Sequence, residues 1–328
     1  MVKKIQKDEL SGDREIVKNN QLINAHYRLT ANEQKLVLTL CSKIKSDDIT
    51  FKEFSLSKRE FLELMNLNDS GKNYQNLKSI CDKLASRVFT IDTGNGFRKF
   101  SWLHHIEYQE KESKILIQFH DCLAPYLLYV KNNIYTKYKL GMVLQFKSEY
   151  TIRIYELCKQ YLNIGSRTII LDELRKILGL NDKEYARYNN FKRIILEKAQ
   201  TEINKKSDVE IKLNEIKQGK KVTSINFEIE RNFNFVEPID NWYDYQKYKN
   251  KSIDDISEIL TDIIMEYYKV SIPVQLISNG TYDKTAILQT VFELKEGYYR
   301  DRQIKNPTLY FLQVLDNKTK QLEVKQDV

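Results

Sequence analysis

The segment YNNFKRIILEKAQTEINKKSDVEIKLNEIKQGKKVTSINFEI (188–229) predicts a helix followed by two strands. Apolar residues recur there every three or four positions, the spacing of a helix that buries one side: Phe191, Ile194, Ile195, Ala199 and Ile203. Farther along, Ile225, Phe227 and Ile229 alternate with polar residues, and the turn QGKK separates them from VEIKLNEI (209–216). Alternation on both sides of a short turn is typical of an antiparallel hairpin.

Two more helices precede this stretch. The segment TIILDELRKILGLND (168–182) predicts a short amphipathic helix that Asp172 opens as its capping residue. Before it, EYTIRIYELCKQYL (149–162) predicts another helix with one apolar face. Three helices followed by a hairpin is the order of elements in a winged helix, a variant of the helix-turn-helix.

The same order occurs once more, nearer the start of the chain. There FSLSKREFLELMNLND (54–69), capped by Ser57, echoes residues 168–182, and EQKLVLTLCSKI (33–44) is the helix before it. A third helix has its own apolar stripe: Leu77, Ile80, Cys81, Leu84, Ala85 and Val88. Strands are expected after it in VFTI (88–91), KFSWLHHIEY (99–108) and KILIQF (114–119), with a turn at Gly94-Asn95-Gly96. The repeat favours two winged helices over the alternative, a single larger α+β domain.

We therefore predict an α+β, mostly helical protein with tandem winged-helix domains followed by a small helical C-terminal domain. The expected parts are a flexible N-terminus at 1–14, a first winged helix at 15–132, a second at 133–237 and a helical region at 238–328. Pro125 and Pro238 are interpreted as boundary markers just beyond each hairpin. In the last region one helix is predicted from an apolar stripe, Ile253, Ile256, Leu260, Ile263, Ile264 and Tyr267, with others near 283–300 and after Asn306-Pro307.

Positive charge is concentrated in the first two-thirds of the chain. Residues 1–238 carry 41 basic and 31 acidic side chains, a net charge of +10, whereas residues 239–328 carry 12 and 14, a net charge of −2. This excess indicates a polyanionic partner for the winged helices, and the alternative is an ordinary solvated surface in a Lys-rich chain. The acidic tail, residues 239–328, is expected to bind DNA poorly. It could dock a partner protein or pack on the neighbouring domain, and the sequence favours neither alternative.

The outer side of each third helix carries side chains of the types that recognise DNA. Arg, Asn, Gln and Lys have the donor geometry that matches purine edges in the major groove, whereas solvated charges on a core-packed helix are the alternative. A basic hairpin is expected after the third helix of each copy. In the second copy, the basic turn of this hairpin suits contact with phosphates or the minor groove. The predicted DNA-binding residues are Lys72, Asn73, Gln75, Lys78 and Lys83 in the first copy, and Arg187, Asn189, Lys192, Arg193, Lys220 and Lys221 in the second. Gln200 is expected on the same outer side.

Residues 188–229 resemble the iteron-binding, theta-type plasmid replication initiator family, whose members have two winged helices. The similarity lies in Phe191 followed by Lys-Arg, an aliphatic pair, Ala199, Glu-Ile-Asn at 202–204 and then strand, basic turn and strand. The opening VKNNQLINAHYRLTANEQKLVLTL (17–40) is similar to the family's start, and the resemblance extends over about residues 15–237. Glu197-Lys198 departs from the family, in which a Pro often precedes the Ala, and this departure concerns the local helix geometry.

The resemblance implies a function. A monomer would bind direct repeats of double-stranded DNA at a plasmid origin, help to melt the adjacent AT-rich DNA, and recruit the host initiator and replicative helicase. A homodimer in equilibrium with the monomer would repress the protein's own promoter. The first winged helix would form the dimer surface, through the sheet predicted from 97–108 and 114–119, with Trp102 as a buried anchor.

Enzymatic alternatives lack their motifs. A DNA-nicking rolling-circle initiator needs two metal-binding histidines separated by one residue, whereas His104 and His105 are adjacent and are expected on opposite faces of a strand. There is no phosphate-binding loop and no C-x-x-C pair, and the widely spaced Cys41, Cys81, Cys122 and Cys158 indicate reduced thiols. No apolar run is long enough to span a bilayer and no signal peptide is evident. We expect a cytoplasmic, non-catalytic protein with no cofactor, metal or membrane partner, and a plain transcriptional repressor remains the alternative.

Overall fold

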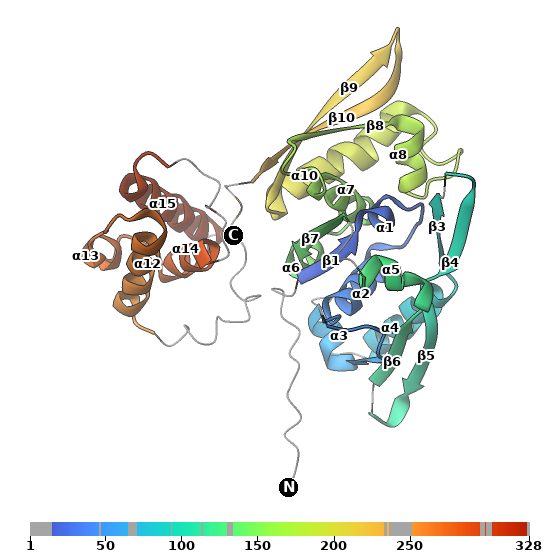
Figure 1. The fold of residues 1–328 in the computed structure, drawn as a ribbon, viewed down its shortest axis with the longest axis horizontal. Coiled ribbons are helices and arrows are strands. Elements are labelled where there is room, and N and C mark those ends of the chain that lie inside the picture. Colours follow the sequence, from blue (N-terminus) through green and yellow to red (C-terminus); the bar gives the residue numbers. More distant parts are fainter. Residues whose placement is uncertain are drawn as a thin grey trace. The chain divides into compact units, whose positions relative to one another are not determined.

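The computed structural model describes residues 15–45, 47–64, 71–92, 94–112, 114–129, 134–232, 235, 251–295, 299 and 304–326 (Figure 1). The chain divides into two compact units, Met1–Asn232 and Phe233–Val328, and the first contains both predicted winged helices. No helix among the described residues has the length and apolar character needed to cross a membrane.

The second winged helix has the predicted order of elements. Its helices are α7 (Glu149–Lys159), α8 (Leu171–Ile177) and a continuous third helix made of α9 (Tyr188–Phe191), a π-helical turn (Lys192–Leu196) and α10 (Glu197–Lys206). Strands β8 (Ser166–Ile170), β9 (Val209–Gln218) and β10 (Lys221–Arg231) form an antiparallel sheet in the order β8-β10-β9. The hairpin prediction is confirmed, because β9 and β10 pair antiparallel, and the alternating Ile225, Phe227 and Ile229 are each 1% exposed.

The π-helical turn changes which residues the third helix buries. Phe191, Ile195, Ala199 and Ile203 lie in the core as predicted, but Ile194 is only half-buried and Leu196 is buried instead. A π-helical turn closes i→i+5 hydrogen bonds and so adds one residue to the turn. Everything after Leu196 is therefore rotated relative to a regular helix.

The first winged helix repeats this topology. Helices α2 (Ala31–Ser42), α3 (Lys58–Leu64) and α4 (Gly71–Ala85) combine with strands β2 (Phe54–Ser57), β5 (Leu103–Gln109) and β6 (Lys114–Phe119), and the sheet order is β2-β6-β5. Between α4 and β5 the chain inserts a separate hairpin, β3 (Val88–Asp92) with β4 (Phe97–Ser101). The segment 99–108 is therefore two strands that break at Trp102, and its prediction as one strand is wrong.

Helices α3, α4 and α8 differ in how closely they follow the predicted caps and apolar stripes. Ser57 caps α3, because the Glu60 amide donates to Ser57 Oγ (3.2 Å) and Glu60 Oε2 accepts from the Ser57 amide (2.7 Å). The Asp172 cap is wrong, since Ile170 occupies the N-cap position of α8 without a side-chain hydrogen bond and Asp172 lies in the first turn. The stripe of α4 is narrower than predicted, with Leu77, Cys81 and Leu84 buried, Ile80 half-buried, and Ala85 and Val88 exposed.

A further two-stranded sheet joins the start of the chain to the segment between the two copies. Strand β1 (Glu15–Asn19) pairs antiparallel with β7 (Tyr135–Lys139), next to the short helices α1 (Asn20–Asn24) and α6 (Leu140–Leu144). Pro125 lies beyond the first hairpin, at the start of helix α5 (Ala124–Leu127), which packs on β1, and its interpretation as a boundary marker stays a prediction. Pro238 lies outside the described residues. The boundaries 15–132 and 133–237 stay a prediction.

Trp102 is buried inside the first copy. It is 0% exposed, with its ring 5.0 Å from that of Tyr27 and 4.8 Å from that of Phe89. A side chain enclosed in the monomer's own core cannot also anchor a second chain, so that prediction is wrong.

The C-terminal unit is a helical bundle. Its helices are α12 (Ile253–Tyr268), α13 (Val274–Ser278), α14 (Lys284–Lys295) and α15 (Pro307–Gln326), around a core that includes Ile256, Leu260, Ile264, Val291 and Phe311. The predicted helices are confirmed, α13 was not predicted, and α15 begins at Pro307 as expected. The prediction that Tyr267 ends the apolar stripe of α12 is wrong, because Tyr267 is 40% exposed and Tyr268 packs on Phe311 instead.

Candidate nucleic-acid interface

One arginine stabilises the turn that leads into the third helix of the second copy. Arg175, in the last turn of α8, donates to the carbonyl oxygens of Asn181 (3.2 Å), Glu184 and Tyr185 (3.1 Å). Its guanidinium also lies 5.5 Å from the ring centre of Phe191, the first buried residue of the third helix. The long turn between the two helices is therefore a fixed structure, which orients the helix that follows.

Most of the predicted residues of this helix face solvent. Arg187, Asn189 and Arg193 are exposed, as their positions opposite the apolar stripe require. Lys192 is half-buried and lies 2.8 Å from Glu215 Oε1 on strand β9. Gln200 is not on the outer side, since its side chain donates to the carbonyl of Ile211 on the same strand (3.0 Å). The added residue of the π-helical turn explains this error, because Thr201 takes the outer position predicted for Gln200.

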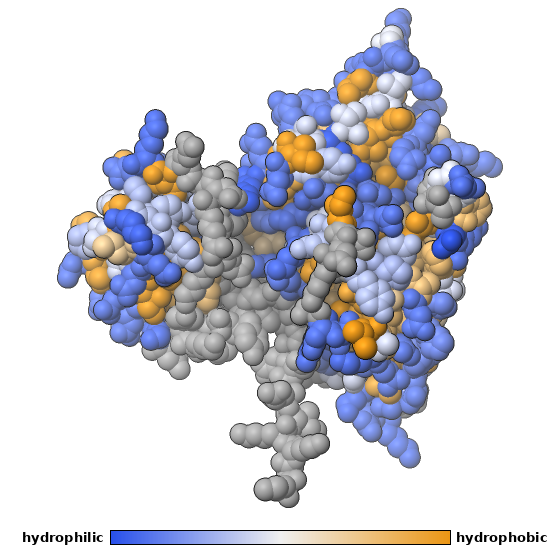
Figure 2. Space-filling model, viewed as in Figure 1, coloured by the Kyte–Doolittle hydropathy of each residue, from blue (hydrophilic) through white to orange (hydrophobic). Residues whose placement is uncertain are grey.

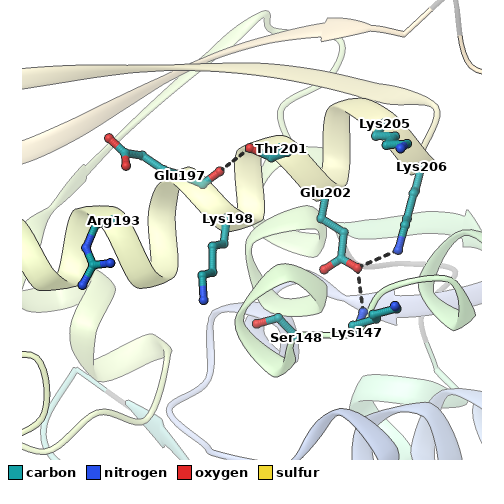
Figure 3. Close-up of a pocket in the computed structure, with 9 residues that line it drawn as sticks. All are labelled: Lys147, Ser148, Arg193, Glu197, Lys198, Thr201, Glu202, Lys205 and Lys206. Atoms are coloured by element: carbon teal, nitrogen blue, oxygen red, sulfur yellow. Dashed lines mark hydrogen bonds and ion pairs between the residues drawn. The ribbon is translucent and has the colours of Figure 1, made fainter.

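The outer side of the helix forms one wall of an open groove of about 580 Å³ (Figure 3). The other wall is the start of α7, at Lys147 and Ser148. Figure 3 shows Arg193 and Lys198 projecting from the same side of the helix. The lining residues are Lys147, Ser148, Arg193, Glu197, Lys198, Thr201, Glu202, Lys205 and Lys206.

The groove has a strong positive charge. Glu202 accepts from the Lys147 amide (2.8 Å) and from Lys206 Nζ (2.9 Å), and although burial raises its pKa, these bonds lower it overall. The side chains of four exposed cations, Lys147, Arg193, Lys198 and Lys205, have no ion-pair partner among the residues that the structure describes. Unneutralised cations along one groove suit a polyanion that passes along the helix. Of these four, the sequence predicted only Arg193. Lys147 lies on a different element, and Lys198 and Lys205 follow the π-helical turn, whose added residue changes the direction in which they point.

The hairpin of the second copy is a basic wing. Strand β8 pairs with β10 only over Ser224–Glu228, so the tip of the hairpin extends past the sheet (Figure 1). Gly219 opens the tip turn with φ +60°, and Lys217, Lys220 and Lys221 are exposed around it. Figure 2 shows hydrophilic residues covering this tip.

Glu215 connects the wing to the third helix. Its carboxylate accepts from Tyr188 Oη (3.0 Å) and pairs with Lys192 (2.8 Å) on the helix and with Lys217 (3.1 Å) on the wing. These bonds, that from Lys192 first, lower the pKa of Glu215 to about 2. The arrangement fixes the angle between wing and helix, and it makes Lys192 a connector as well as a predicted DNA contact.

The stability that Glu215 contributes should depend on pH. Its folded-state pKa, about 2, is below the unfolded value of 4.5, so the contribution is fully present above pH 4.5 and is lost as the pH falls toward 2. Urea unfolding of the wild type and of Glu215→Gln should differ by a constant amount above that range and converge below it. Glu228→Gln, an exposed carboxylate on the same hairpin, is the control. A difference that grows with falling pH would contradict this account.

The first copy offers a weaker surface. Gln75 and Lys83 are exposed on α4, whereas Lys78 is half-buried with its Nζ 5.5 Å from the ring centre of Tyr108. The side chains of Lys72 and Asn73 lie outside the described residues. The predicted basic hairpin is wrong for β5 and β6, whose loop mixes Glu112 with Lys111 and Lys114. The exposed Arg98 and Lys99 lie instead on the inserted β3–β4 hairpin.

The two adjacent histidines depart from the expected geometry. A β-bulge between Leu103 and His105 brings the rings of His104 and His105 to 5.7 Å, too close for opposite faces of a regular strand. His105 Nε2 lies 2.8 Å from Glu53 Oε2. In the described part of the chain, no group of three or more His, Cys, Asp or Glu side chains is placed to hold a metal ion.

Two family models match the chain in the order of its two winged helices. The family described as "Initiator Replication protein, WH1" matches residues 15–159, and that described as "Initiator Rep protein, WH2" matches residues 170–229. The chain is 26% identical over 242 residues to an Escherichia coli "Replication initiation protein", covering 69% of this chain and 73% of that protein. It is 30% identical over 140 residues to the Escherichia coli "PI protein", covering 38% of this chain and 46% of that one.

A solved structure has the same fold. The crystal structure of the Pi initiator protein in complex with iteron DNA matches with a TM-score of 0.54 and 20% sequence identity, covering 66% of this chain and 97% of that one. The two matched family models together span more than half of the residues and coincide with the two winged helices, so the chain belongs to the family of initiator replication proteins.

Proposed function

We propose that this protein initiates plasmid replication by binding direct repeats of double-stranded DNA at the origin. The observation that carries the proposal is the surface of the second copy, where the outer side of a rigidly oriented third helix, a groove with four unpaired cations and a basic wing lie on connected elements. The family to which the chain belongs supports it, as does the likeness to an initiator that was crystallised with iteron DNA.

The residues divide into two roles by their geometry. Arg193 and Asn189 stand on the exposed first turns of the third helix, where base edges of the major groove are read. Lys147, Lys198 and Lys205 in the groove, and Lys220 and Lys221 on the wing, are point charges that suit phosphates. The exposed Gln75 and Lys83 of the first copy would contact a second segment of the same duplex, joined by Lys72, Asn73 and Lys78 as sequence predictions.

The finer steps belong to the same proposal. Bound monomers would promote melting of adjacent AT-rich DNA and recruit the host initiator and replicative helicase, and a homodimer in equilibrium with the monomer would repress the promoter. The C-terminal bundle, with its net charge of −2 over 239–328, is the part suited to a protein partner rather than DNA. The protein would work in the cytoplasm without cleaving DNA.

Selection of duplexes from a random library by the purified full-length chain tests the proposal. We expect enrichment of a non-palindromic site bound by one chain, with contacts to about 6–10 phosphates and an affinity that falls about a thousandfold or more between 50 and 200 mM salt. An inverted repeat bound by two chains would support the plain repressor instead. A product nicked in the presence of magnesium would support the nicking enzyme. No enrichment and a salt slope near zero would overturn DNA binding itself.

A further inference from the structure

Residues 23–28, which we call the bridging segment, contact the first copy on one side. The backbone of His26 exchanges two hydrogen bonds with Thr90 of β3, each 2.9 Å long. The ring of Tyr27 packs edge-on against Trp102 at 5.0 Å, and Trp102 is fully buried. The segment is thus part of the first copy's core.

On its other side the bridging segment is held by the second copy. Arg153 of α7 donates from Nη2 to the carbonyl oxygens of Ile23 and Ala25, both at 2.8 Å, and of Ile177 at 3.3 Å. Its Nη1 donates to the hydroxyl of Tyr27. One guanidinium therefore joins the segment to α7 and to the end of α8.

The buried charges around Arg153 favour a single arrangement. Arg153, Glu156 and Lys18 are 2%, 1% and 1% exposed, and Glu156 pairs with both cations, at 3.2 Å and 2.7 Å. The hydroxyl of Tyr138 also donates to Glu156. Arg153 and Glu156 share helix α7, so a movement of the copies would separate Glu156 from Lys18 and Arg153 from the carbonyl oxygens of the bridging segment. Each separation would leave a buried charge without a partner, which is strongly unfavourable. Intermediate positions of the two copies are therefore disfavoured.

Two further contacts lie at the edge of this cluster. Arg28 pairs with Glu149 at the start of α7 and with Glu184 in the turn before the third helix. Gly179, at φ +68°, approaches so closely that an added Cβ would lie 2.8 Å from the Tyr27 carbonyl oxygen and 2.9 Å from the Arg28 amide nitrogen. The backbone of Gly179 therefore lies directly against the backbone of Tyr27 and Arg28, and this close contact prevents the two copies from sliding past each other here.

The bridging segment leads directly to both third helices. Thr30, two residues beyond it, caps α2 in a capping box with Glu33, and Glu33 pairs with Arg87, which follows α4. In the second copy, Glu184 belongs to the turn that Arg175 holds under the third helix. A continuous series of short contacts thus runs from α4 to the third helix of the second copy.

We propose that the bridging segment determines the distance and rotation between the two third helices, and so restricts the protein to one spacing between the two DNA segments that it reads. This inference rests on the proposed function. Each inserted base pair moves one segment by about 3.4 Å and turns it by roughly 35° about the DNA axis. If the bridging segment holds the two copies rigidly, they cannot both reach their DNA segments after such an insertion. If the connection is loosened, the copies can move to reach both segments.

The test compares spacing tolerance in Arg28→Ala and Gly179→Ala with that of the wild type. The probe is the duplex selected by the wild-type chain, unaltered and with two base pairs inserted between its two parts. We expect the insertion to weaken wild-type binding at least about tenfold and to weaken binding by the two variants less than about threefold. Lys52→Ala, which removes a surface ion pair with Asp48 away from the segment, is the control and should behave as the wild type.

A measurement without DNA separates this inference from the proposed function. Spin labels at Ser79→Cys on α4 and Thr201→Cys on α10, both exposed positions, report the distance between the third helices in a chain whose partly exposed Cys122 is replaced by Ser. We expect a narrow distance distribution in the otherwise wild-type chain and a broader one when Arg28→Ala is added. Equally broad distributions, or equal spacing tolerance in all variants, would overturn the inference even if the protein selects its site. If no site is selected while the distances change as expected, the proposed function fails and the rigid connection stands.

Discussion

Arg193→Ala is expected to weaken binding to the selected site by about 1–3 kcal/mol and to change binding to random DNA much less. Arg193 is exposed on the third helix and has no ion-pair partner among the described residues, so its fork is free to bond guanine O6 and N7 together. The loss should fall mainly on one base pair. Fluorescence anisotropy against the selected duplex, its single-base variants and random DNA measures the effect.

Lys220→Ala is the matched control for this prediction. Lys220 stands at the tip turn of the wing, where its flexible charge suits a phosphate, so its removal should weaken specific and random binding alike. It should also lower the salt slope by about one unit. If Arg193→Ala shows this same uniform loss, Arg193 is a phosphate contact and the assignment of the base-reading face is wrong.

Glu156→Ala is expected to destabilise the first unit by about 3–5 kcal/mol, because it leaves Arg153 and Lys18 buried without their counter-charge. Glu156 is 1% exposed, and although burial alone would raise its pKa, the two cations, Lys18 first, hold that pKa below 4.5. Unfolding in urea at neutral pH, followed by circular dichroism, measures the loss.

A surface pair of similar length provides the control. Glu112 lies 2.8 Å from Lys114 but is 59% exposed, so Glu112→Ala should change the unfolding midpoint little. Equal effects of the two substitutions would show that burial of the Glu156 cluster is not what stabilises the first unit.

The hairpins could be predicted from sequence because their apolar residues alternate strongly. The short strands and the β1–β7 sheet could not, because their sequence patterns are weak or lie far apart in the chain. Ile115, Ile117 and Phe119 alternate without interruption and are all 0% exposed. Strands β2 and β8 were missed because they have four or five residues and run directly into a helix, with no turn residues between. The β1–β7 sheet was missed because its strands are more than a hundred residues apart, and no local pattern reports such a pairing.

The exposed residues of the candidate site could be predicted for the regular first turns of the third helix, but not for the part that follows the π-helical turn. Rotation from the apolar stripe placed Asn189 and Arg193 on the exposed side correctly. It failed at Gln200, since the π-helical turn adds a residue that no pattern of apolar positions revealed. That turn lies directly before Glu197-Lys198, where the sequence departs from the family. Lys18 and Arg153 had no sequence signal, because a buried cation differs from a surface one only by its surroundings.

In the proposed function, one chain places both winged helices on one continuous duplex. Hydroxyl-radical footprinting of the full-length protein on the selected site, at a concentration where one chain is bound, tests it most directly. We expect two protected blocks on one face of the duplex, about one helical turn apart, and Arg193→Ala should weaken only the block of the second copy, at its base contact. A single protected block, or two blocks that appear only when a second chain binds, would contradict it.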